Sequence, residues 1–244
     1  MPKYFDNITE TNTLNQITGE FIVVSDEFKI LCASIISKFT FAQNLLQKII
    51  YTTHREKFNN VRTTLRNFPN PRSRMDFLCS YPYGEKDEII EIVFDFARSI
   101  FKEIYEVRNV LTHEIWASAT DYPDSILFSN LDENSRLMMA SSRVWHDECA
   151  TPHDVFNATI RYIRNVKIIN SNHLRLAIGD IDLCNWCLLN IDNMLNEEDT
   201  GRRNELRQSF HIFGGTSHLF KKPPISTDVV EYSSSKKKEI THKN

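Results

Sequence analysis

Apolar residues recur every three or four positions in two long stretches of the chain, the pattern of helices with one buried face. The first stretch begins at Ser25, a residue type that caps helix N-termini. Its repeating apolar positions are Phe28, Leu31, Ile35, Phe39, Ala42, Leu46 and Ile49. We expect the helical run to end before "FPNP", because Pro69 and Pro71 cannot continue a helical hydrogen-bond ladder. The second stretch predicts the clearest helix, with a core-facing stripe of Ile89, Val93, Phe96, Ile100, Ile104, Val107 and Leu111.

The pattern changes after Trp116. Two apolar runs flank "NLDEN" in "DSILFSNLDENSRLMMASSRVWH" and predict a β hairpin. Further along, Thr151 is placed to cap a helix with Pro152 at its first position, and a last helix is expected from about Leu174 to Leu195. We therefore predict a mainly α protein, a helical bundle with a small β-hairpin insertion. Its helical domain covers residues 1–200 with the insertion at about 117–150, and residues 201–244 form a C-terminal extension.

Composition places the chain among ordinary globular proteins of a reducing compartment. The hydrophobic fraction is 41%, the charged fraction 25% and the net charge −3, which excludes a globally basic protein that coats nucleic acid. The start "MPKYFDNITETNTLNQ" has no apolar signal region, and no apolar run approaches the ~20 residues needed to span a bilayer. Five cysteines suit reduced thiols better than a disulfide framework. We expect a cytoplasmic protein without a membrane partner, whose end "SSSKKKEITHKN" is a disordered tail.

A local basic segment stands out against this weakly acidic background. Between His54 and Arg74 the chain reads "HREKFNNVRTTLRNFPNPRSR", with Glu56 as its single acid. Clustered cations attract phosphate groups in a salt-dependent way. The candidate RNA-binding residues are therefore Arg55, Arg62, Arg66, Arg72 and Arg74. The alternative is a solvated helix face followed by a loop.

The clearest helix ends in "RNVLTH", which carries Arg108, Asn109 and His113. Arginine binds phosphate through a planar fork, and histidine moves protons near neutral pH. In a straight helix Asn109 and His113 share a face, whereas Arg108 and His113 are ~140° apart. They converge if the helix distorts, if the arginine side chain curls round, or if two copies of the chain face each other. We expect Asn109 to hydrogen-bond the histidine ring. The alternative is that all three are ordinary polar residues, with His113 stabilising the helix C-terminus.

This stretch resembles the R-N-x-x-x-H motif of the HEPN superfamily, a group of small helical bundles. Many are metal-independent endoribonucleases of toxin–antitoxin and anti-phage systems. The resemblance implies that Arg108 and His113 form the catalytic pair and that Asn109 orients it. It also implies a homodimer with one shared cleft, RNA as substrate, no cofactor, a possible antitoxin or sensor protein as partner, and products ending in a 2′,3′-cyclic phosphate and a 5′-hydroxyl. Some members carry a tyrosine, modified by the antitoxin, where this chain has Ile115.

Two alternatives to a ribonuclease remain open. His146 and Cys149 together with Cys184 and Cys187 supply four soft ligands of a zinc site, although they come from separate segments. As a redox pair, Cys184 and Cys187 lack a surrounding thioredoxin-like βαβ pattern, and we predict no metal. The second alternative is a HEPN-like module that binds RNA, nucleotide or protein without catalysis, because fold alone does not imply activity.

Overall fold

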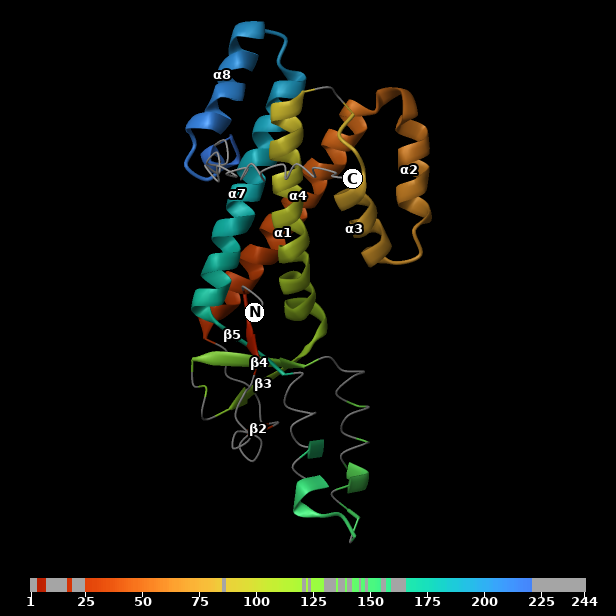
Figure 1. The fold of residues 1–244 in the computed structure, drawn as a ribbon, viewed down its shortest axis with the longest axis vertical. Helices are drawn as coiled ribbons and strands as arrows, with labels where there is room; N and C mark the ends of the chain where they lie inside the picture. The colour runs from red at the N-terminus through yellow and green to blue at the C-terminus, as the bar shows by residue number, and fades with distance from the viewer. Residues whose placement is uncertain are drawn as a thin grey trace, which may run out of the picture.

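The computed structural model describes residues 4–7, 17–18, 25–84, 87–119, 122, 124–129 and 166–220, with short pieces between 135 and 158. Three long helices form its centre: α1 (Asp26–Thr53), α4 (Glu88–His113) and α7 (Ser171–Asn196). Helix α7 packs along both α1 and α4 (Figure 1). The prediction of a mainly helical fold is confirmed. Within the described residues, no helix is both long enough and apolar enough to cross a membrane.

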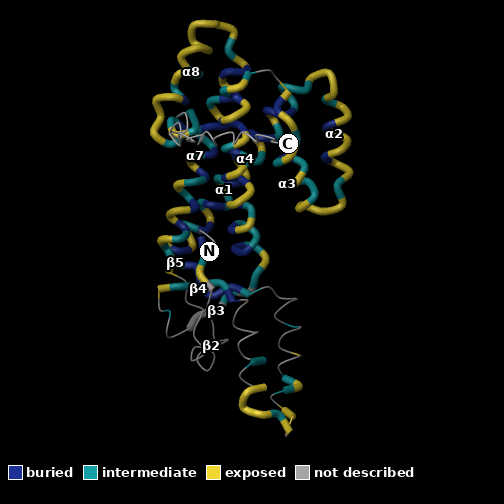
Figure 2. The backbone as a smooth tube through the Cα atoms, in the orientation of Figure 1, coloured by how far each residue is buried: buried dark blue, intermediate teal, exposed yellow. Residues whose placement is uncertain are grey.

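Most residues of the two predicted apolar stripes lie in the core, whereas Leu31, Ile89 and Phe96 are only partly buried. Ser25 caps α1 by accepting a hydrogen bond from the Phe28 backbone N–H, and Asp87 caps α4 in the same way through the N–H groups of Ile89 and Ile90. The buried residues lie along the inner faces of the long helices (Figure 2). Between α1 and α4, the rings of Phe39 and Phe101 stack with centroids 4.5 Å apart. Burying one such side chain contributes about 1.5–3 kcal/mol, so these faces dominate the stability of the bundle.

The first predicted helical stretch divides into several helices. Helix α1 ends at Thr53, and a 3-10 turn η2 (Arg55–Lys57) leads into α2 (Phe58–Asn67) and α3 (Pro71–Ser80). The stop before "FPNP" is confirmed at the end of α2, and Asn70 caps α3 through the Ser73 N–H at 2.8 Å. Together α2 and α3 form a helical hairpin beside the bundle (Figure 1).

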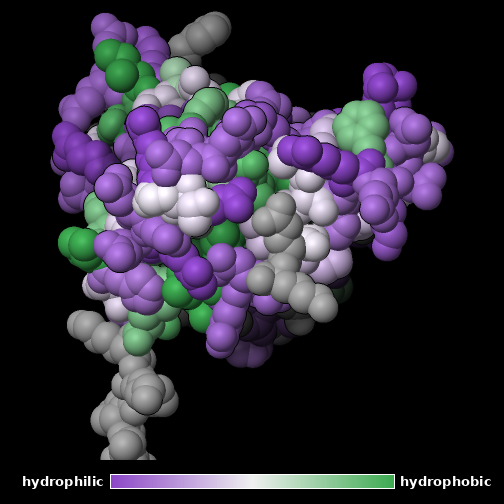
Figure 3. All heavy atoms as spheres, turned by 90° about the horizontal axis from the view of Figure 1, so that it is seen from above, coloured by the Kyte–Doolittle hydropathy of each residue, from purple (hydrophilic) through white to green (hydrophobic). Residues whose placement is uncertain are grey.

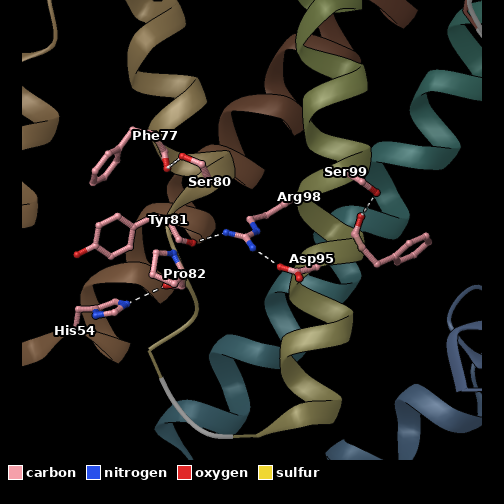
Figure 4. Close-up of polar contacts among 9 residues, drawn as sticks. His54, Phe77, Ser80, Tyr81, Pro82, Asp95, Arg98 and Ser99 are labelled. Atoms are coloured by element: carbon pink, nitrogen blue, oxygen red, sulfur yellow. Dashed lines mark hydrogen bonds and ion pairs between the residues drawn. The ribbon is translucent and has the colours of Figure 1, made fainter.

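Polar contacts tie the chain after α3 to both α1 and α4 (Figure 4). The Arg98 guanidinium on α4 donates to the Tyr81 carbonyl and pairs with Asp95, while the ring Nε2 of His54 lies 2.9 Å from the Pro82 carbonyl oxygen. Gly84 approaches α1 so closely that a Cβ there would be 2.4 Å from the Thr53 carbonyl oxygen. These contacts hold the α2–α3 hairpin at a fixed place against α4.

A small antiparallel sheet covers the end of the bundle where α4 stops. Its strands are β1 (Asp6–Asn7), β2 (Ile17–Thr18), β3 (Ile115–Ala119), β4 (Ser125–Ser129) and β5 (Lys167–Asn170), in the order β1-β5-β4-β3-β2. The β-hairpin element is present, but the predicted pairing across "NLDEN" is wrong. Strand β4 pairs with β3 before it and with β5, and the described residues 135, 139 and 142–144 are helical. The buried run Ile126–Phe128 predicts a strand but not its partner.

The region after α7 begins with a packed helix, α8 (Thr200–Ile212), and a 3-10 turn, η3 (Ser217–Phe220). Asp199 caps α8, and Phe210 is fully buried with its ring centroid 5.5 Å from that of Trp186 on α7. The first part of the predicted extension therefore packs on the bundle. The end predicted to be disordered, within residues 221–244, lies outside the described residues. The cap at Thr151 is confirmed, because its Oγ1 accepts from the Asp154 N–H at 3.2 Å and residues 152–154 are helical.

Candidate nucleic-acid site at the end of α4

The last turn of α4 carries the three predicted catalytic residues on the side away from the core. Val110 and Leu111 are buried, Arg108 and Asn109 are partly buried, and His113 is exposed. The helix ends at His113 because Glu114 takes an extended conformation, with its N–H still bonded to the Val110 carbonyl. Strand β3 follows directly. The polar residues thus stand at the junction of helix and sheet.

Arg108 brings the three side chains together within one chain. Its Nη1 lies 3.2 Å from the Asn109 Oδ1 and 3.2 Å from the His113 Nε2. The long arginine side chain therefore spans the ~140° that separates positions 108 and 113 on a straight helix. This convergence needs no second copy of the chain. A guanidinium only donates hydrogen bonds, so the contact requires a neutral His113 ring that accepts at Nε2 and keeps its proton on Nδ1.

The expected hydrogen bond from Asn109 to the His113 ring is not the one that the structure shows. Among the described residues, the Asn109 side chain accepts from Arg108 instead, so it orients the guanidinium. The reason is geometric: the Arg108 side chain lies between the other two. Thr112 adds a bond from its hydroxyl to the Arg108 carbonyl at 2.8 Å, which closes the last helical turn.

Glu114 is a neighbour that the sequence argument missed. Its side chain is only 9% exposed and pairs with Lys167 of β5 at 2.6 Å. This ion pair joins the end of α4 to the sheet and fixes the direction in which the chain leaves His113. The signal in the sequence was an acid between a polar helix end and an apolar strand. Its partner, Lys167, lies 53 residues further along the chain, so the sequence alone did not indicate the ion pair.

A cavity of about 360 Å³ opens beside Arg108, between α1, α4 and the connection from α2 to α3. Its lining includes Phe39, Gln43, Phe68, Arg74, Tyr105 and Arg108. Two residues that were predicted for different reasons line the same cavity: Arg74 from the basic segment and Arg108 from the R-N-x-x-x-H motif. Among the described residues, two guanidinium groups line it and no carboxylate does. Sequence reasoning missed Gln43, whose only signal was a polar position one turn after Phe39 on a strongly apolar helix.

The other candidate RNA-binding residues do not reach this cavity. Arg55 on η2, Arg62 and Arg66 on α2, and Arg72 at the start of α3 are all exposed. Within the described part of the chain, none of these four forms an ion pair with an acid. Hydrophilic residues dominate the projecting part of the surface that α2 and α3 form at the right of Figure 3. We call Arg55, Arg62, Arg66 and Arg72 the basic face.

Arg74 has a structural contact as well as a place in the cavity. Its Nε and Nη2 donate to the Leu65 carbonyl at 3.2 and 3.0 Å. The side chain therefore links α3 to α2 at the closed end of the hairpin. The same bonds position the guanidinium at the cavity wall, and a charge held in this way loses little conformational entropy when it binds an anion.

The cysteine pair considered for zinc lies in the core. Cys184 and Cys187 are fully buried, and the Cys184 thiol lies 3.3 Å from the Ala97 carbonyl oxygen. Burial raises the pKa of Cys187 to about 12, so its thiol stays protonated, whereas zinc binds the thiolate. Cys149 is exposed. Over the residues described, no cluster of three or more His, Cys, Asp or Glu side chains is arranged to hold a metal ion.

Comparison with known proteins finds no family model, no curated protein and no solved structure that matches this chain. The geometry around Arg108 is therefore the main indication of what the protein does.

Proposed function

We propose that the protein is a metal-independent endoribonuclease of the toxin–antitoxin or anti-phage defence type, acting in the cytoplasm through Arg108, Asn109 and His113. The observation that carries the proposal is the 3.2 Å contact between Arg108 Nη1 and His113 Nε2. It places a permanent cation beside a proton carrier on an exposed helix end. RNA cleavage without a metal needs these two groups, one for the 2′-hydroxyl proton and one for the charge on the phosphate.

The reaction begins when the His113 Nε2 exchanges its bond to Arg108 for one to the substrate 2′-hydroxyl. His113 takes that proton as the 2′-oxygen bonds to phosphorus, and the bond from phosphorus to the 5′-oxygen breaks. Arg108, released from the ring, donates to the phosphate oxygens as their negative charge increases. Asn109 keeps the guanidinium near the helix end through its Oδ1. The products carry a 2′,3′-cyclic phosphate and a 5′-hydroxyl.

The departing 5′-oxygen also needs a proton, and this requirement supports a homodimer. His113 has just accepted a proton from the 2′-hydroxyl and cannot protonate the leaving group at the same instant. A second copy of the chain supplies a second His113 across a shared cleft. That ring must enter the reaction protonated and released from its own Arg108, so that it donates a proton to the 5′-oxygen and ends neutral, while the first His113 ends protonated. The divergence of Arg108 and His113 on a straight helix gives the homodimer no further support, because the two side chains meet within one chain.

The test is cleavage of single-stranded RNA by purified protein in EDTA, with product ends identified by mass spectrometry. We expect cleavage that survives the chelator and leaves a 2′,3′-cyclic phosphate. Cleavage that stops in EDTA and returns with a divalent metal would contradict the proposal. Light scattering at micromolar concentration tests the dimer, and an active monomer would exclude the second His113.

A second candidate is a non-catalytic module that binds RNA, nucleotide or protein. One feature favours it: Arg108 lines the cavity, but His113 does not belong to the lining. A ligand held by Arg74 and Arg108 therefore need not meet the histidine. Tight RNA binding without cleavage of any tested RNA would support this candidate over the nuclease.

A further inference from the structure

We propose that the cavity beside Arg108 binds one unpaired nucleotide, with its base between aromatic side chains and its phosphate on the two arginines. The role of this cavity in choosing where RNA is cut rests on the proposed ribonuclease activity, whereas nucleotide binding itself does not. The ligand is a nucleoside monophosphate group, either within a single-stranded RNA or as a free nucleotide.

The size and shape of the cavity suit one nucleotide. Its volume of about 360 Å³ lies at the small end of the range for ligand pockets, about 300–1,000 Å³. The helical hairpin closes one side and the long helices close another. A base that is stacked and paired inside a double helix cannot enter such a space, so the ligand must be unpaired.

The apolar lining provides surfaces for a base. Phe68 comes from the α2–α3 connection and Tyr105 from α4, while Phe39 on α1 forms the deeper wall at 3% exposure. The Phe39 and Tyr105 rings lie 6.0 Å apart and are tilted by 30°. Stacking of a base on an aromatic side chain typically strengthens binding by about 5- to 150-fold and tolerates any base.

Two amide side chains give the cavity a means of distinguishing one base from another. Gln43 lines it from α1, and no hydrogen bond of its amide to another described residue is present. Asn70 uses its Oδ1 to accept from the Ser73 N–H, which leaves its amide N–H₂ available at the wall. An amide offers a donor beside an acceptor, the pattern that matches the N6 and N7 edge of adenine. We therefore expect a preference for adenine.

The charges of the cavity suit the phosphate. Arg74 uses Nε and Nη2 for the Leu65 carbonyl, and Arg108 uses Nη1 for Asn109 and His113. Each guanidinium therefore has a further nitrogen available for an anion. Arg108 lines the cavity and also contacts His113 outside the lining, so an RNA strand with one nucleotide in the cavity can pass its next phosphate by the proton carrier. A nucleotide seated in the cavity would thus set which phosphodiester bond reaches His113.

The test measures binding of adenosine 3′-monophosphate and cytidine 3′-monophosphate by calorimetry to the full chain, to Gln43→Leu and to Arg74→Met. Gln47→Leu is the matched control, because Gln47 lies one turn further along α1 and bonds to Tyr51 at 2.9 Å outside the cavity. We expect Gln43→Leu to weaken the adenosine nucleotide about tenfold and the cytidine nucleotide much less. Arg74→Met should weaken both, while Gln47→Leu changes neither. Thermal melts should show Gln43→Leu folded like the parent.

Equal adenosine affinity in the parent and in folded Gln43→Leu would overturn the proposal, as would the absence of nucleotide binding to the parent. A single-stranded adenosine oligonucleotide that binds more tightly than the monophosphate identifies RNA as the source, and the reverse identifies a free nucleotide. Gln43-dependent binding without RNA cleavage contradicts only the ribonuclease. Cleavage that ignores the base at every position, with Gln43→Leu unchanged, contradicts only the nucleotide cavity.

Discussion

Two cavities lie along α4, each with an arginine of this helix in its wall, and they differ in charge. The cavity around Arg98, about 430 Å³, contains two acids, Asp76 and Asp95, against Arg98 and Lys102. The described lining of the cavity around Arg108 contains two arginines and no acid. Arg98 is engaged by a backbone carbonyl and a carboxylate, whereas Arg108 contacts a neutral amide and a neutral ring. One arginine therefore holds the fold together, and the other keeps a charge available for an anion.

The thiol in the Arg98 cavity supports this distinction. Burial raises the pKa of Cys79 to about 11, although the charges of Arg98 and Lys102 act in the opposite direction. The thiol is therefore protonated at neutral pH and is a poor nucleophile. Positive charge in this cavity is compensated by its own acids and does not activate the neighbouring group.

The largest effect is expected when the groups at the end of α4 are removed. We expect His113→Ala and Arg108→Ala each to lower the rate of RNA cleavage by about 10²–10⁴, the usual effect of losing a positioned acid–base or charge-stabilising group. His211→Ala is the matched control, because His211 is also an exposed histidine in the last turn of a helix, α8. Cleavage assays and thermal melts measure both effects.

Parent-like cleavage by His113→Ala would show that the histidine is not catalytic. A much lower melting temperature of that variant, with His211→Ala unchanged, would show instead that His113 stabilises the end of α4. Because His113 and His211 are both exposed, we expect His113→Ala and His211→Ala to stay folded.

The two arginines should also differ in their contribution to stability. The Arg98 side chain is 13% exposed and bonds to the Tyr81 carbonyl, and its loss leaves that carbonyl without this donor. Hydrogen bonds that involve a charged group contribute about 1.5–3 kcal/mol, so Arg98→Ala should lower the free energy of unfolding by about that amount. Arg108→Ala should lower it by less, about 0.5–1.5 kcal/mol, because its partners Asn109 and His113 are uncharged and are not buried in the core. Urea titrations of the two variants compare these values, and equal losses would show that the arginines do not differ in role.

Some parts of the fold could be predicted from the sequence alone, and others could not. The apolar stripes of α1 and α4 could be predicted because burial follows the helical period, and the place of α7 was predicted to within three residues at each end. The capping residues Ser25 and Thr151 could be predicted from local chemistry. Helix α8 was missed because only Phe210 of its residues is buried, so no stripe marks it. Long-range contacts hold this region on the bundle, among them the stacking of Trp186 with Phe213, 4.0 Å between centroids, and the burial of Phe210 against Trp186.

The candidate site could be predicted only in part, for a related reason. Arg108, Asn109 and His113 are close in sequence, so one short motif named them all. The cavity beside them is assembled from α1, α4 and the α2–α3 connection. Arg74 was named as one of several cations, and only the hairpin geometry separates it from the exposed Arg62 and Arg66. Long-range packing, rather than local pattern, selects these residues.

A third experiment compares the Arg108 cavity with the basic face. We expect a variant with Arg62→Gln, Arg66→Gln and Arg72→Gln to bind single-stranded RNA about 30-fold more weakly at low salt, and to lower the slope of log affinity against log salt by about 2, since each phosphate contact contributes about 0.7. The control changes Lys29, Arg175 and Arg202 to Gln. These three are exposed but already paired with Asp26, Glu27 and Glu197. An equal loss of slope in both triple variants would mean that net charge, and not the basic face, attracts RNA.

The smallest effect is expected at Asn109, which orients the Arg108 guanidinium but takes no part in proton transfer. Its Oδ1 accepts from the Arg108 guanidinium and contacts no proton that moves in the proposed reaction. Asn109→Ala removes one hydrogen bond, about 0.5–1.5 kcal/mol, so kcat for RNA cleavage should fall by about two- to tenfold. Asn109→Asp is the informative companion. Its carboxylate would hold Arg108 in an ion pair like that of Arg98 with Asp95, so we expect weaker binding of adenosine 3′-monophosphate than in Asn109→Ala. Equal nucleotide affinities in the two variants would show that an acid beside Arg108 is harmless, and that the difference between the two cavities does not depend on charge.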